Sequence, residues 1–328
     1  MARKRTVVTG GAGFIGAHLV SQLVAAGHDV TVVDPQAEAG MFPDVVRIEK
    51  ASILDQKLLQ RSFSGAQWIF HLAGIAHLWS SDRKTYDRVN RQGTARVLAA
   101  AGDCGCEKLI VTSTEAILRD WRDHGDHTLT ELEPSPPIEA MPGPYCRSKW
   151  QANHLIHKTA RRSPGVISLY PTIPVGPGDR WKTAPAQMLE TFLFNTPPVY
   201  LQTVLNLVPA TDVASAHLLA AEKAEPGDRF ILGGQDIKLS TLLEWLEMKT
   251  GQRMPKRHIP YVLAQAIGFF SEGIARITGK SPLATLEGVR LARHAWRVDS
   301  SHAQKVLGWH PGKARNAVLE AIDEMMPP

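Results

Sequence analysis

The sequence predicts an α/β fold, a doubly wound parallel sheet followed by a smaller α+β lobe. Short apolar runs alternate with amphipathic runs through the first half of the 328-residue chain, as in βαβ units with right-handed crossovers. After Pro171 this alternation stops, and prolines and glycines crowd residues 171–178. We therefore expect two domains, residues 1–172 and residues 173–328, with segments of the second packing back on the first.

The first βαβ unit carries a glycine fingerprint. Residues 6–8 form an apolar strand candidate and residues 14–26 an amphipathic helix candidate. Between them, Gly10 allows a tight turn and Gly13 lets a pyrophosphate approach the backbone, while Gly16 lets the helix pack close to the strand. The N–H groups of the helix's first turn then face the anion. The pattern predicts a dinucleotide site of the Rossmann type, although the glycines could also serve only a turn. The expected cofactor contacts here are Gly10, Gly13, Phe14, Ile15 and Gly16.

The second predicted strand, residues 29–34, ends in Asp34. A carboxylate at this place accepts hydrogen bonds from both ribose hydroxyls of an adenosine and repels a 2′-phosphate. The expected cofactor is therefore NAD rather than NADP. Pro35 and Gln36 follow Asp34, so no arginine stands directly after it to reverse this preference.

The later elements continue the alternation. Ligands bind at the carboxyl ends of the strands in such a sheet, so Gly74 and Thr114, which follow two predicted strands, are candidate site residues. Further strands are expected at residues 45–48, 68–73, 108–113, 166–170 and 229–232, and helices after Asp55, over residues 86–101, over residues 212–223 and, two or three of them, at the C-terminal end.

Tyr145 and Lys149 are four residues apart, and on a helix they share one face. Free tyrosine has a pKa near ~10 and is a poor base at neutral pH. An ammonium beside it, together with the positive charge of a nicotinamide, would stabilise the phenolate. Tyr145 could then take a proton from a substrate hydroxyl or give one to a carbonyl oxygen, and Thr114 could hydrogen-bond the reacting oxygen. The alternatives are an exposed Tyr and Lys on a surface helix and ordinary strand-end polar residues.

As a set, these residues resemble the extended short-chain dehydrogenases/reductases, the NAD-dependent epimerase/dehydratase family. The similarity runs from about residue 5 to about residue 320. Segments 171–179, 206–214 and 230–234 resemble a branch that holds dihydroflavonol-reductase-like enzymes, 3β-hydroxysteroid-dehydrogenase-like enzymes and hopanoid-associated sugar epimerases. The matching motifs are Gly10, Gly13 and Gly16, Asp34, residues 71–74, Val89-Asn90, Gly93-Thr94, Ser113-Thr114, and Tyr145 with Lys149.

The resemblance implies a Thr–Tyr–Lys site. Thr114 would supply the hydroxyl, Tyr145 would act as acid and base, and Lys149 would bind the nicotinamide ribose and lower the pKa of the tyrosine. It also implies a homodimer built on the helices around Gly93 and Tyr145. The further cofactor contacts that it implies are Ser52 and Ile53 beside the adenine, Leu72, Ala73, Gly74 and Asn90 along the cleft, and Pro171 and Thr172 near the nicotinamide.

Two departures from the family pattern bear on the reaction. In nucleotide-sugar dehydratases and decarboxylases of the family, a glutamate base typically stands two residues after the hydroxyl residue, where this chain has Ala116. Glu115 stands one position early and is expected to point to the other side. Nucleotide-sugar epimerases usually carry an arginine that grips the diphosphate, and the corresponding place in this chain, near Leu205 and Asn206, is neutral. Arg180 and Lys182 could substitute for it.

We therefore expect reversible hydride transfer between NAD(H) and a secondary alcohol or ketone. Two alternatives stay open: epimerisation, in which the same hydride returns to the opposite face, and a non-catalytic NAD-sensing protein. The substrate is expected to be a small hydroxy or keto compound, either a sugar or a hydrophobic alcohol. The candidate substrate contacts are His77 and Trp79 in the loop of residues 75–82, Glu115, Arg180 and Asn206.

Several of these contacts have a structural alternative. A lone histidine such as His77 is more often structural than functional. Leu78, Trp79, Trp181 and Phe192 suit a hydrophobic substrate, but they suit an interface between lobes equally well.

Composition limits the partners and the location. The net charge is +5 with scattered basic residues, so we expect no nucleic acid. Three cysteines fit a reducing compartment, and Cys104-Gly-Cys106 is too tight and isolated for zinc, so no metal is expected. A strand begins almost at once, so no signal peptide is expected and a cytoplasmic location is favoured.

The longest apolar stretch, residues 259–277, is interrupted by Gln265, Ser271, Glu272 and Arg276. It is too polar to span a bilayer, so no transmembrane segment is expected. A buried helix is the favoured interpretation, and a helix lying on a membrane surface is the alternative.

Overall fold

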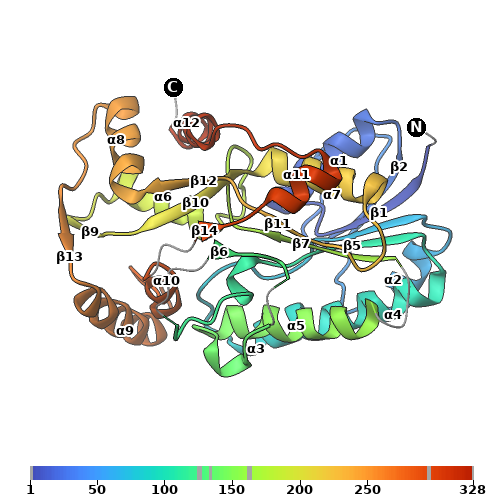
Figure 1. Cartoon of the computed structure of the whole chain (residues 1–328), viewed down its shortest axis with the longest axis horizontal. Helices are drawn as coiled ribbons and strands as arrows, with labels where there is room; N and C mark the ends of the chain where they lie inside the picture. Colours follow the sequence, from blue (N-terminus) through green and yellow to red (C-terminus); the bar gives the residue numbers. More distant parts are fainter. Residues whose placement is uncertain (1–2, 124–127, 133–134, 161–164, 294–296, 327–328) are drawn as a thin grey trace.

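The computed structural model describes residues 3–123, 128–132, 135–160, 165–293 and 297–326. At its centre these residues form a seven-stranded sheet in the order β11-β7-β5-β4-β1-β2-β3, with every neighbouring pair parallel. Figure 1 shows the sheet running through the larger half of the molecule. The strands are β1 (Arg5–Thr9), β2 (Asp29–Val33), β3 (Arg47–Glu49), β4 (Trp68–His71), β5 (Lys108–Thr112), β7 (Val166–Pro171) and β11 (Arg229–Leu232).

Helices cover both faces of this sheet, which confirms the predicted fold class. β4 and β7 are buried along their whole length, as strands of a parallel sheet are when both faces are covered. On one face lie α1 (Phe14–Ala25), α7 (Ala210–Lys223) and α11 (Ser301–Leu307), and on the other α2 (Gln56–Phe63), α4 (Thr94–Cys104) and α5 (Pro144–Ala160) (Figure 1).

The helix expected over residues 86–101 is instead a continuous run of three parts. A short α3 (Lys84–Tyr86) leads into a π-helical turn, η1 (Asp87–Gly93), which leads into α4. Apolar periodicity does not reveal a π turn, because the turn adds residues without changing their type. Gly93 closes the turn against Ile53, since a Cβ at Gly93 would lie 2.4 Å from the Ile53 Cδ1.

The smaller half of the molecule has its own core. A three-stranded sheet, β12-β10-β8, and a two-stranded sheet, β13-β9, pack with three helices around Leu189, Leu243 and Val318. Its elements are β8 (Ile173–Val175), α6 (Ala184–Phe194), β9 (Val199–Leu201), β10 (Val204–Pro209), β12 (Gln235–Lys238), α8 (Leu239–Thr250), β13 (Arg257–Ile259) and α12 (Ala314–Met325). Between β10 and β12 the chain returns to the large sheet through α7 and β11.

A short paired layer lies between the two halves. β6 (Thr128–Leu129) pairs with β14 (Arg297–Val298), and the 3₁₀ turns η2 (Glu115–Ile117) and η3 (Ile138–Ala140) contribute to a small apolar cluster beside Tyr145. This cluster supports the first turn of α5.

The number of C-terminal helices differs from the expectation of two or three. Five follow β12 in the described part of the chain: α8, α9 (Tyr261–Thr278), α10 (Leu286–Leu291), α11 and α12. The six residues of α10 and the seven of α11 are too few for a recognisable apolar period.

The long apolar stretch forms α9, and the expectation that it is buried was wrong for one of its faces. Its buried positions are Ala264, Gly268, Glu272 and Ala275, whereas most of its large apolar side chains are exposed. None of the helices within the described ranges has the length and hydrophobicity needed to cross a bilayer.

Candidate active site

The glycine turn between β1 and α1 has the tight geometry that a dinucleotide needs. Gly10 has φ +75°, and a Cβ there would lie 2.5 Å from the backbone nitrogen of Ala73. A Cβ at Gly16 would lie 2.1 Å from the Gly10 carbonyl oxygen. Gly13 is the N-cap of α1 and offers no side chain, so the N–H groups of Phe14 and the residues after it stay open to an anion.

Asp34 lies directly beside this turn. Its Oδ2 accepts a hydrogen bond from the Ala12 N–H at 3.1 Å, and its Oδ1 accepts one from the Gln36 N–H at 2.8 Å. Burial raises the pKa of the carboxyl, and the two N–H groups act in the opposite direction. A carboxylate oxygen has two lone-pair sites, so each oxygen keeps capacity for a ribose hydroxyl. These residues fit a dinucleotide.

The other predicted cofactor residues line the same end of the sheet. Ile53 is buried, and the Ser52 hydroxyl accepts a hydrogen bond from the Leu54 N–H at 3.2 Å. The Leu72 N–H donates to the Thr9 carbonyl at 3.0 Å, and the buried Thr172 donates its N–H to Leu232 at 3.2 Å. Ala73 and Gly74 follow β4, and Pro171 ends β7.

Asn90 contacts protein groups with its whole side-chain amide. Its Oδ1 accepts from the Ile75 N–H at 2.7 Å, and its Nδ2 donates to the Ile75 carbonyl at 3.1 Å and to the Ser148 hydroxyl at 2.8 Å. Asn90 therefore ties the loop after β4 to α5. Its predicted contact with the cofactor stays a prediction.

α5 presents Tyr145 and Lys149 on one face, next to the end of β5. The Thr114 side chain lies close enough to the Tyr145 hydroxyl to lower its pKa, and the Lys149 ammonium donates to the Thr112 carbonyl at 2.9 Å. The Ser148 hydroxyl donates to the Tyr145 carbonyl at 2.7 Å. The three predicted catalytic residues are therefore close together.

Burial sets the protonation of this group. It raises the pKa of Tyr145, as do the neighbouring ionisable groups of Cys146, Glu287 and Glu115, while the Thr114 side chain lowers it. Burial lowers the pKa of the Lys149 amine to about 8. Lys149 is expected to lower the pKa of Tyr145. In the protein without a cofactor it does not contribute to that pKa, because its ammonium is directed at the Thr112 carbonyl. The lowering stays a prediction for the complex with a cofactor.

Glu287 contributes to the site, and the sequence did not suggest it. Its Oε2 accepts from the Tyr145 N–H at 3.0 Å and its Oε1 from the Cys146 N–H at 2.8 Å. It thus caps the first turn of α5 from α10. Burial raises the pKa of its carboxyl. A Cβ at Gly143 would lie 2.4 Å from the Glu287 carboxyl, so a glycine is needed there.

The predicted substrate residues are not brought together in the same way. The backbone carbonyl of His77 accepts from the Tyr86 hydroxyl at 2.9 Å, and Trp79 is half-buried in the same loop. Glu115 is buried and forms an ion pair with Arg119 at 3.1 Å, although it is near enough to Tyr145 to raise the tyrosine's pKa. Arg180 is exposed.

Asn206 and two aromatic residues have structural partners. The Asn206 Nδ2 donates to the Asp236 carboxylate at 2.7 Å, and its Oδ1 accepts from the Gly234 N–H at 2.8 Å. Phe192 belongs to the core of the smaller half. Trp181 donates its indole N–H to the Ala12 carbonyl at 2.8 Å, and so joins the smaller half to the glycine turn.

His71 is a second residue that sequence analysis left without a role. Its two ring nitrogens contact the hydroxyls of Thr9 at 2.8 Å and Thr94 at 2.9 Å. Burial lowers its pKa to about 3. It joins β1, β4 and α4 directly beneath the cofactor end of the sheet. Within the described ranges, no group of three or more His, Cys, Asp or Glu residues is placed to hold a metal.

A glycine turn at a helix N-terminus, an acidic residue at the end of the second strand, and a Tyr–Lys pair beside a strand-end hydroxyl together define a dinucleotide-dependent oxidoreductase. Comparison with known proteins gives the family. The chain belongs to the NAD dependent epimerase/dehydratase family, whose model matches residues 6–233. It is therefore an enzyme of the extended short-chain dehydrogenase/reductase type.

Two curated relatives match it over nearly its whole length. It is 31% identical to a proposed dihydroflavonol 4-reductase of Synechocystis sp. over 96% of this chain and 92% of that one. It is 26% identical to the sterol demethylase protein B of Methylococcus capsulatus over 97% of both chains. The crystal structure of a protein called gox2253 superposes with a TM-score of 0.84 at 29% identity over 98% of both chains.

Proposed function

We propose that the protein transfers a hydride reversibly between NAD(H) and a secondary alcohol or ketone. The observation that carries this proposal is that Thr114 lies beside Tyr145, close enough to lower its pKa, with Lys149 one helical turn further along α5. A bound nicotinamide ring would accept the hydride and give it back. When the substrate alcohol is oxidised, its C–H bond gives up the hydride and its hydroxyl proton passes to Tyr145; in the reduction Tyr145 returns that proton to the carbonyl oxygen.

The protonation of the site suits the reduction. Because its pKa is raised, Tyr145 holds its proton at neutral pH and can donate it to a carbonyl oxygen. Thr114 shares the same oxygen through its hydroxyl. Lys149 keeps ammonium protons for a ribose hydroxyl, since its contact with Thr112 uses only one of three donors.

NAD is the cofactor that we propose in preference to NADP. The buried carboxylate of Asp34, fixed by the Ala12 and Gln36 N–H groups, can accept hydrogen bonds from ribose hydroxyls but would repel a 2′-phosphate. Gly10, Gly13 and the first turn of α1 would hold the pyrophosphate.

The substrate that we propose lacks a nucleotide diphosphate. Beside Asn206, where an arginine would be needed to grip phosphates, lies the carboxylate of Asp236, which would repel them. Lys182 is paired with Glu190 at 2.8 Å. The names of the two relatives, a reductase and a sterol demethylase protein, also support a substrate other than a nucleotide sugar.

Epimerisation is the second candidate, supported by the description of the family. It would use the same residues, with the hydride returned to the opposite face. Purification without added cofactor, followed by denaturation and identification of the released nucleotide, separates the two candidates. A near-stoichiometric load of NAD favours epimerisation, because the cofactor is regenerated in place. An empty protein that binds NADH reversibly favours a dehydrogenase or reductase.

Substitution of the tyrosine tests the catalytic assignment. Tyr145→Phe removes the proton donor and acceptor, so we expect turnover to fall by about 10²–10⁴-fold while the affinity for NAD stays nearly unchanged. Tyr200→Phe, which alters a half-buried tyrosine of β9, is the matched control and should keep its turnover. If Tyr145→Phe kept full turnover, the assignment would be wrong. A non-catalytic NAD sensor would show no turnover in either variant or in the wild type.

We also propose a homodimer and a cytoplasmic location. α4 and α5 pack against each other and would form the shared helical bundle that the family resemblance implies. Three free cysteines suit a reducing compartment. Residues 173–328 would supply the substrate lobe. Light scattering of the purified protein tests the dimer, and fractionation of cells tests the location.

A further inference from the structure

α9 has the reverse of the usual arrangement of a surface helix. Its inward face consists of small and polar residues, among them Ala264, Gly268, Glu272 and Ala275. In an ordinary surface helix the large apolar side chains face the core. Here they face solvent, and we call them the outward face of α9: Val262, Leu263, Phe269, Phe270, Ile274 and Ile277.

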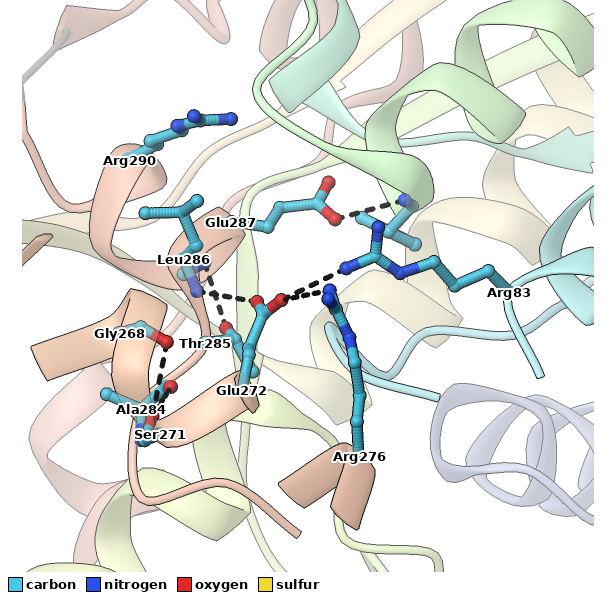
Figure 2. Close-up of polar contacts among 12 residues, drawn as sticks. Arg83, Gly268, Ser271, Glu272, Arg276, Ala284, Thr285, Leu286, Glu287 and Arg290 are labelled. Atoms are coloured by element: carbon cyan, nitrogen blue, oxygen red, sulfur yellow. Dashed lines mark hydrogen bonds and ion pairs between the residues drawn. The ribbon is translucent and has the colours of Figure 1, made fainter. Parts of the chain in front are cut away.

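Polar contacts fix this orientation (Figure 2). The buried Glu272 accepts from the Leu286 N–H at 2.8 Å and pairs with Arg83 at 3.1 Å. The Ser271 hydroxyl donates to the Ala284 carbonyl at 2.5 Å. These bonds attach the inward face to α10 and to the segment before α3. The outward face therefore cannot rotate toward the core without breaking them and leaving a buried carboxylate unpaired.

The positive charge of the protein is concentrated in the part of the sequence that contains this helix. Residues 251–297 contain eight Lys or Arg and two acidic residues, Glu272 and Glu287. Both acids are buried, whereas the basic residues are all exposed. The whole chain has 37 basic and 32 acidic residues, so the remainder has 29 against 30 and a net charge of −1. The basic residues are Arg253, Lys256, Arg257, Arg276, Lys280, Arg290, Arg293 and Arg297.

We propose that the outward face of α9 docks the protein on a bilayer surface that contains anionic lipids. The helix has 18 residues and is about 27 Å long. An apolar face flanked by Lys and Arg inserts to the boundary between headgroups and acyl chains. Each nearby cation adds attraction to anionic headgroups. An exposed acidic residue in this segment would oppose the attraction, but residues 251–293 contain none.

A second copy of the chain is a poorer occupant of the same face. In a two-fold symmetric dimer the same patch meets itself. Arg276 and Lys280, at the C-terminal end of α9, would then lie near the same cations of the other copy, and residues 251–293 contain no exposed acidic residue to pair with them. Like charges brought together in this way oppose association.

Flotation of the purified full-length protein with vesicles tests the proposal. We expect it to float with vesicles of phosphatidylcholine and phosphatidylglycerol in equal parts, to float less with phosphatidylcholine alone, and to be released by added salt. The double variant Phe269→Ser, Phe270→Ser should lower the bound fraction about tenfold or more. These side chains are 64% and 66% exposed, so the variant should fold, and an unchanged thermal midpoint checks this.

A matched control separates this face from general hydrophobicity. Phe194 on α6 and Met248 on α8 are 56% and 65% exposed, so Phe194→Ser with Met248→Ser should float like the wild type. Arg253→Glu with Lys280→Glu, which alters two exposed cations, should abolish the preference for phosphatidylglycerol. Equal losses in the control and in the Phe269, Phe270 variant would overturn the proposal.

Two further outcomes are decisive. A wild-type protein that floats with neither kind of vesicle would overturn the proposal. If light scattering then showed oligomers that the Phe269, Phe270 variant dissociates, the face would be an interface between copies. The proposal does not depend on the reaction, because Tyr145→Phe leaves α9 intact and should float like the wild type.

Discussion

The carboxylate of Glu287 holds the N–H of Tyr145 at 3.0 Å, so a residue of α10 caps the helix that carries the predicted acid and base. The two residues are far apart in sequence and belong to different parts of the molecule. The position of Tyr145 therefore depends on how residues of the C-terminal region pack against α5.

Glu287→Gln tests this dependence. The amide group of glutamine would face one of two N–H groups that now have a carboxylate partner, and an unsatisfied buried donor costs about 1–3 kcal/mol of unfolding free energy. Glu287 also raises the pKa of Tyr145. Replacing the carboxylate with a neutral amide should therefore lower the pKa of Tyr145. Because the reduction needs a protonated Tyr145, kcat should begin to fall at a lower pH on the alkaline side of its pH profile.

The pH profile of kcat and urea unfolding measure both effects. Glu320→Gln, an exposed glutamate of α12, is the control and should change neither. An unshifted alkaline limb in a destabilised Glu287→Gln protein would leave Glu287 with a structural role alone.

Asp34→Ala should weaken the binding of NAD. It removes an acceptor of charge-assisted hydrogen bonds, each worth about 1.5–3 kcal/mol, so the Kd should rise about tenfold or more and the preference over NADP should shrink. Titrations with NADH and NADPH measure both quantities. Asp29→Ala alters the other end of the same strand, where the carboxylate pairs with Arg47, and should leave both constants unchanged. If Asp34→Ala left the ratio of the NADH and NADPH affinities unaltered, the proposed role of Asp34 would be contradicted.

His71 should make the stability depend on pH. Its pKa in the folded chain is about 3, lowered by burial from 6.5. A group whose pKa is depressed by folding stabilises the protein above its unfolded pKa, and this contribution is lost as pH falls from 6.5 toward 3. The free energy of unfolding should therefore fall by up to about 1.4 kcal/mol per pH unit from this residue.

Urea unfolding between about pH 7.5 and about pH 5 measures that slope. His71→Gln should reduce the slope of the unfolding free energy against pH by the contribution of about one proton. His310→Gln, which alters an exposed histidine, should leave the slope unchanged. The same slope in both variants would show that other groups cause the pH dependence.

Two glycine substitutions should change the stability of the protein in opposite directions. Gly16→Ala would place a Cβ 2.1 Å from the Gly10 carbonyl oxygen and should cost about 1–3 kcal/mol, as overpacking does, and disturb NAD binding. A Cβ at Gly102 in α4 would meet no heavy atom within 4 Å apart from the backbone of its own helix and its chain neighbours, so Gly102→Ala should stabilise the protein by about 0.5–1 kcal/mol. Thermal unfolding checks both, and equal effects would contradict the close approach at Gly16.

The parts of the fold that follow from local pattern were predictable. Gly10 and Gly16 predict a turn because a strand precedes them and a helix follows them. The predicted strands begin within two residues of the observed ones; the largest difference is at β3, which begins at Arg47. Tyr145 and Lys149 could be placed together because helical spacing requires it. Each of these inferences uses residues close in sequence.

What could not be predicted depends on contacts between distant residues. The cap from Glu287 requires knowing where α10 lies relative to α5. The engagement of Asn90 with Ile75 and Ser148 depends on the π turn. The outward direction of Phe269 could not be read from the number of apolar residues in α9, because the helix is attached through Glu272 on the opposite side.

The uneven distribution of charge gives the molecule a permanent electric dipole. β13 and α9 lie at one end of its longest axis (Figure 1), and the segment of residues 251–297 carries the whole positive excess. A dipole of this kind rotates a diffusing protein before contact. Toward any strongly anionic surface, including a cation-exchange resin, the chain should therefore present the end that carries α9 first and keep the large sheet turned away.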